Sequence, residues 1–192
     1  MSTYQLTLPA QTRESAAAEA RQILQAAQAR LGFIPNMYTR MANLPALLGT
    51  YIHGYDLFRA QSGLTPPEQE VVLLVVSREN GCEYCVAAHS MIAANMNKVP
   101  AQALEAVRNG TRIEDAKLAA LAEFTQAMVQ KRGNPAPADA AAFLKAGYTE
   151  HHILAIVLAI AVKTISNYSN HLFRTPVDAP FAGFAWSGAW AA

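Results

Sequence analysis

Charged residues are scarce in this chain of 192 residues. Asp, Glu, Lys and Arg make up 15% of the sequence, compared with roughly 25% in an average soluble protein. A surface with so few charges predicts that part of it is covered by another subunit, so we expect a homo-oligomer (dimer, trimer or hexamer). The formal net charge is +1, which provides no basic surface for nucleic acid or an anionic membrane. We therefore expect neither nucleic acid nor a membrane as a partner.

Long hydrophobic runs are also lacking. The longest aliphatic stretch, residues 153–162, is ten residues long, whereas a bilayer needs about 20. It predicts part of a buried core helix. No signal or transit peptide pattern opens the sequence, so we predict a cytoplasmic protein.

Cysteine is rare as well, because Cys82 and Cys85 are the only two. Gly81 directly precedes them and predicts the end of one helix and the turn into the next. His89 follows Cys85 by four residues. On a helix that Cys82 opens, Cys85 and His89 lie one and two turns further along, so the three side chains form one stripe.

Two thiols and an imidazole on one helix face supply the parts of a thiol redox centre. The positive end of the helix dipole lowers the pKa of a thiol, an imidazole can accept its proton, and a second thiol can trap an oxidised sulfur as a disulfide. Alternatives are cysteines that only pack, a structural disulfide and a zinc site. One C-x-x-C and one His give zinc only three ligands, and a structural disulfide lacks the support of a secretion signal. We expect no metal.

Two carboxylates lie near the start of the predicted helix that precedes the cysteines. Thr65, Pro66 and Glu68 form a capping box with proline in the first helical position, which gives Glu68 a structural role. Glu70 is then free for another role, and the apolar run VVLLVV follows it. A carboxylate on so buried a helix needs a partner, which His89 or the thiols would provide. The alternative is a solvated acid favoured by the helix dipole.

At these residues the sequence resembles the carboxymuconolactone decarboxylase-like superfamily, specifically its alkylhydroperoxidase AhpD-like, peroxidase-related branch. The motif is a Glu on one helix and C-x-x-C-x-x-x-H at the start of the next, here Glu70, Cys82, Cys85 and His89. The similarity extends from about Leu31 through GFIPNMY to NYSNH…TP near the C-terminus. It implies an all-α, AhpD-like fold and a homo-oligomer.

The resemblance also implies an enzyme that reduces hydroperoxides through the cysteine pair. Cys85 would attack the peroxide, Cys82 would resolve the oxidised sulfur, and His89 and Glu70 would form a proton relay. No cofactor is implied beyond an external dithiol or protein thiol reductant. Tyr84 stands where the pattern can carry a second His, a departure that would alter the relay or the preferred substrate.

Other functions use the same scaffold. A general thiol-disulfide oxidoreductase would have Cys82 as the more exposed nucleophile, and a redox sensor would be oxidised without turnover. Lactone decarboxylation is less favoured, because the true decarboxylases of the superfamily lack the cysteine pair.

The chain is predicted to be one domain, residues 1–192. A polar arm (about 1–13) and an irregular tail (about 174–192) flank the helices, and the tail is expected to pack on a neighbouring subunit through Phe181, Phe184 and Trp186. Helical spacing, caps and breakers predict helices over about 14–31, 45–61, 65–79, 82–97, 100–109, 113–132, 139–145 and from 149 onward, with a short one before Pro45.

A degenerate internal repeat is also predicted, at an offset of 84 residues. It aligns VVLLVV with AIVLAI, and CEYC with SNYS at 166–169. The second copy would keep the packing without the relay; coincidence between apolar helices is the alternative. The repeat and helix positions make Tyr84, His53, Tyr168 and His171 candidate pocket residues, against the alternative that the histidines are structural, hydrogen-bonded residues.

Overall fold

The computed structural model describes residues 3–188, and within this range the chain is all-α with no strand, as predicted. The elements in order are α1 (Ala18–Leu31), α2 (Asn36–Met41), α3 (Pro45–Gln61), α4 (Pro66–Glu79), α5 (Glu83–Asn95), α6 (Ala101–Asn109), α7 (Ala116–Gln130), α8 (Pro137–Lys145), α9 (Glu150–Phe173) and the 3-10 helix η1 (Ala179–Phe184).

The helix ends follow the caps in the sequence, with one correction at the start. The Thr65–Glu68 capping box is confirmed, and Gly32 ends α1 in the left-handed conformation. Helix α1 begins at Ala18 rather than near residue 14. The hydroxyl of Thr12 accepts from the backbone N–H of Ser15 at 3.2 Å, and such side-chain turns compete with helix formation.

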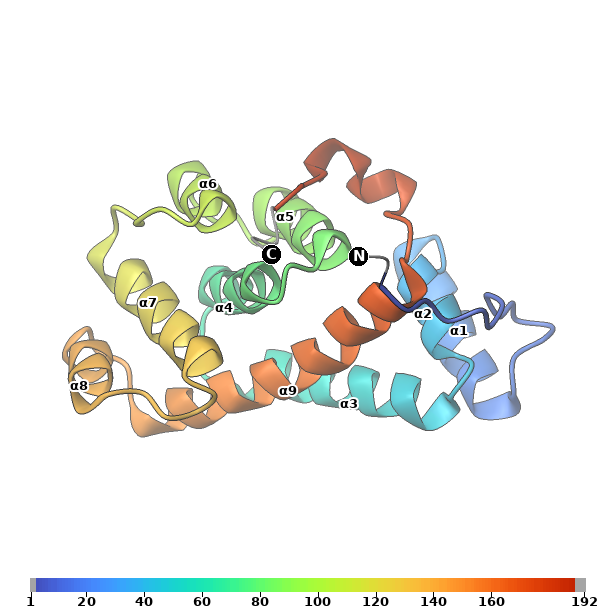
Figure 1. Ribbon diagram of the computed structural model, residues 1–192, viewed down its shortest axis with the longest axis horizontal. Coiled ribbons are helices and arrows are strands. Elements are labelled where there is room, and N and C mark those ends of the chain that lie inside the picture. Colours follow the sequence, from blue (N-terminus) through green and yellow to red (C-terminus); the bar gives the residue numbers. More distant parts are fainter. Residues whose placement is uncertain (1–2, 189–192) are drawn as a thin grey trace.

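Helices α4 and α5 lie at the centre of the molecule (Figure 1). On one side of them are α6, α7 and α8, on the other α1 and α2, while α9 and α3 run side by side along the edge. Residues 71–76 of α4 are at most 2% exposed, so this helix is buried on all sides. A carboxylate on α4 must therefore find its partners inside the protein.

Two clusters of buried side chains form the core, and α9 contributes to both. One cluster gathers around α4, α6, α7 and α8, with the rings of Phe124, Phe143 and Tyr148 stacked at 4.4 and 4.6 Å. The other lies between α1, α2, α3 and the start of α5, and contains both cysteines. The cysteine pair thus sits in an apolar environment, where a charge is costly unless it is paired.

Helix α9 is long and apolar enough to cross a membrane by length and composition alone. The core helix of a globular domain passes the same test, and α9 packs against α3, α4 and α2. The predicted burial of residues 153–162 holds for one face only. Leu154 and Val157 are 69% and 47% exposed, and Tyr168 and Leu172 continue the exposed apolar stripe.

The predicted internal repeat is not confirmed. Between α4 and α5 the chain turns at Gly81, which has a φ of 67°, and Cys82 caps the new helix. Helix α9 runs unbroken through Ser166, the residue aligned with Cys82. The two segments therefore differ where the cysteine motif begins, and the repeat stays a prediction.

The segment after α9 packs in part on its own chain, which corrects the expectation for Phe181; contact of Phe184 and Trp186, both half-buried, with a neighbouring subunit stays a prediction. Phe181 in η1 is 6% exposed and meets Tyr84 edge-on at 6.1 Å. The indole N–H of Trp186 donates to the carbonyl of Arg108 at 2.9 Å. Asp178 anchors the turn by accepting from the backbone N–H of Asn36 at 3.1 Å. Apolar rings and one buried carboxylate thus hold this segment over α5; residues 189–192 lie outside the described range.

Candidate active site

The α4–α5 turn places the two cysteines at the start of α5. The backbone N–H of Cys82 bonds the carbonyl of Ser77 at 2.9 Å, which closes the turn at Gly81. Cys85 lies one turn further along, as predicted. Both thiols are free and buried, at 1% and 2% exposure.

Glu70 and His89 meet inside the protein. Glu70 is fully buried rather than solvated, and its Oε2 lies 2.9 Å from Nδ1 of His89. Its other oxygen accepts from Asn97 Nδ2 at 2.8 Å and from the guanidinium of Arg59. Arg59 comes from α3 and also bonds the hydroxyl of Tyr55. The carboxylate is thus fully satisfied, which allows it to stay charged in the core.

The charge states follow from this network. Burial acts to raise the pKa of Glu70, but His89 and Arg59 outweigh it and hold that pKa below its ordinary value. Burial and Lys163 lower the pKa of His89, although Glu70 opposes them. At neutral pH the pair is therefore a carboxylate and a neutral imidazole. With Nδ1–H donating to Glu70, Nε2 keeps its lone pair and can act as a base.

One face of α9 supplies residues to the site that the sequence analysis did not identify. Asn170 Nδ2 lies 3.3 Å from Cys85 Sγ and 3.7 Å from Cys82 Sγ. Ser166 Oγ lies 3.9 Å from Cys85 Sγ. Lys163, one turn before Ser166, is fully buried and acts electrostatically on both thiols and on His89. A lone lysine inside the apolar run AIVLAIAVKTIS was the signal in the sequence.

The two thiols differ in acidity. Burial and the neighbouring Cys85 raise the pKa of the Cys82 thiol well above its ordinary value. Burial also opposes ionisation of Cys85, but the hydrogen bond from the Cys82 thiol, together with the charge of Lys163, holds its pKa well below the ordinary value. Cys85 is therefore the more readily ionised thiol of the pair, and the thiolate is the nucleophilic form of cysteine.

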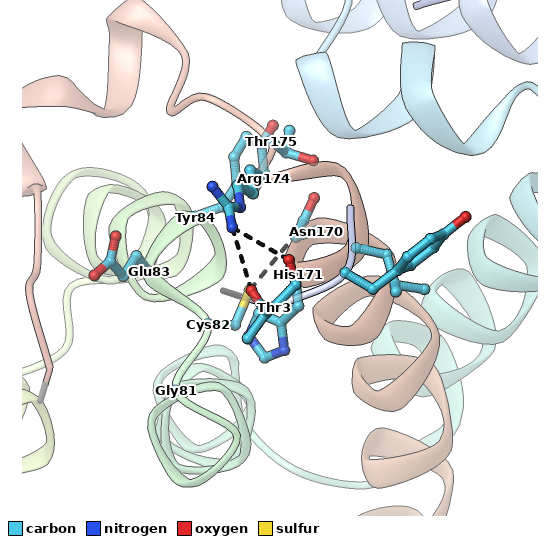
Figure 2. Close-up of a pocket in the computed structure, with 11 residues that line it drawn as sticks. Thr3, Gly81, Cys82, Glu83, Tyr84, Asn170, His171, Arg174 and Thr175 are labelled. Carbon is cyan, nitrogen blue, oxygen red and sulfur yellow. Dashed lines mark hydrogen bonds between the residues drawn. The ribbon is translucent and has the colours of Figure 1, made fainter. Parts of the chain in front are cut away.

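A cavity of about 690 Å³ reaches Cys82 but not Cys85. Its wall comes from the start of α5, the end of α9 and the N-terminal residues, as Figure 2 shows. Two predicted pocket residues, Tyr84 and His171, line it, and the hydroxyl of Tyr84 donates to Asp178. Tyr168 stacks on His171 but points outward with 57% exposure, and His53 is exposed on α3. Neither of these last two lines the cavity, so they are not brought to the site.

The chain is similar in sequence to one described family and in fold to several solved structures. The model of the "Carboxymuconolactone decarboxylase family" matches residues 46–127, which run from α3 to α7 and include the whole motif. No curated protein sequence matches the chain significantly.

Similar solved structures extend over nearly the whole chain. An uncharacterised peroxidase-related protein with an "alkylhydroperoxidase AhpD core" from Ralstonia eutropha JMP134 superposes with a TM-score of 0.81 at 24% identity, covering 91% of this chain and 93% of that one. A peroxidase-related protein from Silicibacter sp. TM1040 gives 0.78 at 21% identity, covering 94% of each chain. A variant of the debrominase Bmp8 in complex with 2,3,4-tribromopyrrole gives 0.75 at 18% identity, covering 95% and 97%.

At such identities the structural similarity concerns the fold, whereas the sequence match concerns residues 46–127. Residues 46–127 are therefore similar in sequence to the carboxymuconolactone decarboxylase family, and residues 3–188 have the fold of AhpD-like, peroxidase-related proteins.

Proposed function

We propose that the protein is a thiol-dependent alkyl hydroperoxide reductase with an antioxidant role, in which Cys85 attacks the peroxide and Cys82 resolves the product. The observation that carries this proposal is the arrangement of the pair: both thiols are free at the start of α5, and Glu70 Oε2 lies 2.9 Å from Nδ1 of His89 and orients the imidazole. The lowered pKa of Cys85 agrees with its role as the attacking thiol. A thiolate with a base and a second thiol in reach is the arrangement that peroxide reduction needs.

The atoms, protons and electrons of the two oxidative steps are accounted for by Cys85, Cys82 and His89. The Cys85 thiolate attacks the distal oxygen of ROOH and becomes a sulfenic acid, and the alkoxide leaves as ROH after taking one proton. The Cys82 thiol then condenses with the sulfenic acid, giving the disulfide and water. Since Nε2 of His89 carries a lone pair, it can accept the Cys82 proton in this step. Two electrons pass from the pair to the peroxide, and an external dithiol or protein thiol restores the pair.

Peroxide consumption by the wild-type protein tests the proposal. With excess dithiothreitol and an alkyl hydroperoxide, we expect turnover at many equivalents per protein, followed by peroxide loss in a ferrous-xylenol assay. Without a donor, consumption is expected to stop at one equivalent, with formation of the Cys82–Cys85 disulfide. Failure to form a disulfide under excess peroxide would refute the proposal.

One observation favours a second candidate function. The cavity reaches Cys82, the thiol that a general thiol-disulfide oxidoreductase would present to its substrate. If the pair cycles between dithiols and disulfides but consumes no peroxide, this second function replaces the first. Since one similar structure is named a debrominase, bromide release from 2,3,4-tribromopyrrole in the same dithiol assay would assign the thiolate to halogenated substrates instead.

We also propose a homo-oligomer in the cytoplasm, where reducing conditions keep both thiols free. The support is the exposed apolar stripe of α9, formed by Leu154, Val157, Tyr168 and Leu172. Light scattering is expected to give a mass of at least two chains, and Leu154→Glu is expected to lower it by placing a charge in the apolar contact. The control Gln25→Glu, exposed on α1, should leave the mass unchanged. A monomeric wild type would contradict this prediction.

A further inference from the structure

Lys163 is the least expected side chain near the site. It lies in the middle of α9 and is fully buried, and its ammonium makes no hydrogen bond of normal geometry to residues 3–188. A buried ammonium without an anion is costly, so a charged lysine at this position needs a negative group nearby. Glu70 already accepts from His89, Asn97 and Arg59. Lys163 lies one turn before Ser166, whose Oγ is 3.9 Å from Cys85 Sγ, so the lysine is on the face of α9 that meets the thiols. Lys163 acts on both thiols, and of the two Cys85 is the one whose pKa is lowered.

The surroundings of Cys85 leave the lysine as its main cationic neighbour. From α5 it is faced by the Cys82 thiol and by His89, which is neutral at pH 7. Tyr51 from α3 and Tyr84 from α5 are raised in pKa by burial and stay protonated. Arg59 is already paired with Glu70 beyond His89. Asn170 adds a neutral donor at 3.3 Å.

We propose that Lys163 is the counter-ion that makes Cys85 the leaving thiolate of the disulfide, so that the reductant enters through the cavity and reacts at Cys82. This inference rests on the proposed redox cycling of the pair, but it does not require that the oxidant be a peroxide.

The step balances without a further reactant. A donor thiolate RS⁻ attacks the sulfur of Cys82 and forms an RS–Cys82 mixed disulfide, and the electron pair of the broken S–S bond leaves on Cys85 as thiolate, beside Lys163. A second donor thiolate attacks the donor sulfur, releases RS–SR, and leaves Cys82, which takes a proton. Exchange is faster when the leaving thiol is the more acidic one, and here that thiol is Cys85.

The proposed pairing of Lys163 with Cys85 also affects the equilibrium between the reduced pair and the disulfide. In the reduced state the ammonium of Lys163 is paired with the Cys85 thiolate, whereas in the disulfide state Cys85 carries no charge. Lys163 therefore stabilises the reduced pair relative to the disulfide and makes the pair more oxidising. Removing the ammonium should therefore favour the disulfide and make the pair less oxidising.

Lys163→Met tests this, because methionine fills the apolar space without a charge. The Cys85 thiolate can take up a proton when the ammonium is removed, so that no buried charge is left unpaired. In equilibrium with glutathione, the variant is expected to shift toward the disulfide by about tenfold or more, which is about 30 mV. Iodoacetamide labelling of Cys85 near pH 6, mapped by mass spectrometry, should slow about tenfold for each unit by which the thiol pKa rises. Lys163→Arg, which keeps the charge, should restore part of both effects.

Lys117→Met is the matched control. It removes a lysine from the surface ion pair with Glu68 at 3.0 Å, so it should alter neither the equilibrium nor the labelling. Circular dichroism and thermal melts establish that each variant is folded. A folded Lys163→Met with an unchanged equilibrium and unchanged labelling would overturn the counter-ion role.

A second experiment identifies the cysteine that the donor thiol attacks. Oxidised wild-type protein is mixed with glutathione, quenched with acid, and the glutathione adduct is mapped by mass spectrometry. We expect the adduct on Cys82 in the wild type and a measurable fraction on Cys85 in Lys163→Met. An adduct on Cys85 in the wild type would overturn the inference. Since no peroxide is used, these outcomes are independent of whether the protein is a peroxidase.

Discussion

Replacing Cys85 by serine is expected to reduce hydroperoxide turnover by about 10³-fold or more, the scale of losing a catalytic nucleophile. The reason is that Cys85 is the proposed peroxide-attacking sulfur, since its pKa is lowered whereas that of Cys82 is raised. Serine nearly preserves the volume and packing, but it cannot be oxidised by peroxide. Stopped-flow measurement should show neither a burst nor a steady rate.

Cys82→Ser is the matched control, because it keeps the nucleophile and removes the resolving thiol. It should consume about one equivalent of peroxide and then stop at the sulfenic acid, which dimedone traps and mass spectrometry locates at Cys85. A Cys82→Ser variant without a burst, beside a Cys85→Ser variant with one, would reverse the two roles. Full activity in both variants would exclude the cysteine pair as the catalytic group.

Removing the carboxylate of Glu70 is expected to have the second largest effect, on stability as well as on activity. In Glu70→Ala the half-buried guanidinium of Arg59 loses its anion, and His89 and Asn97 lose an acceptor. Breaking a buried pair in this way typically costs about 3–5 kcal/mol. Urea denaturation followed by circular dichroism should show a loss of this size. Glu123→Gln, which removes an exposed carboxylate (61% side-chain exposure), should change stability by less than about 0.5 kcal/mol.

The pH dependence of stability gives a further check on Glu70. Its pKa in the folded protein lies below the ordinary value, so its contribution is present above the unfolded pKa of about 4.3 and is lost as pH falls through the folded value. Stability of the wild type should therefore fall steeply below about pH 5. In Glu70→Gln the decline should be shallower, because the amide does not titrate. Equal slopes in the two proteins would contradict the lowered pKa.

Local sequence signals predicted the fold and half of the site. The Thr65–Glu68 capping box separated a structural carboxylate from Glu70, and Gly81 fixed the turn that sets Cys82 at the start of α5. Spacing by helical turns then aligned Cys82, Cys85 and His89. Each of these features acts within a few residues, and short-range patterns therefore suffice to predict it.

The α9 side of the site could not be predicted in the same way. Asn170 lies 85 positions from Cys85 in the sequence, and no periodicity specifies which face of an apolar helix meets which thiol. The repeat alignment gave Tyr168 a position related to that of Tyr84, but on the unbroken α9 Tyr168 points outward. His53 falls on an exposed face of α3, which the position of a single His on an apolar helix did not reveal. Whether Phe181 and Trp186 contact their own chain or a neighbouring subunit depends on tertiary packing. The sequence does not distinguish these two cases.

The position of Lys163 near the end of the chain has a consequence for biosynthesis. The motif with its cysteines leaves the ribosome well before α9 has been made, so a nascent chain carries two thiols but lacks the cation that ionises one of them. Strong nucleophilicity therefore arises only when α9 docks on α4 and α5. On the counter-ion role proposed for Lys163, we expect the unfinished polypeptide to react slowly with oxidants, and the reactive sulfur to mark completed folding.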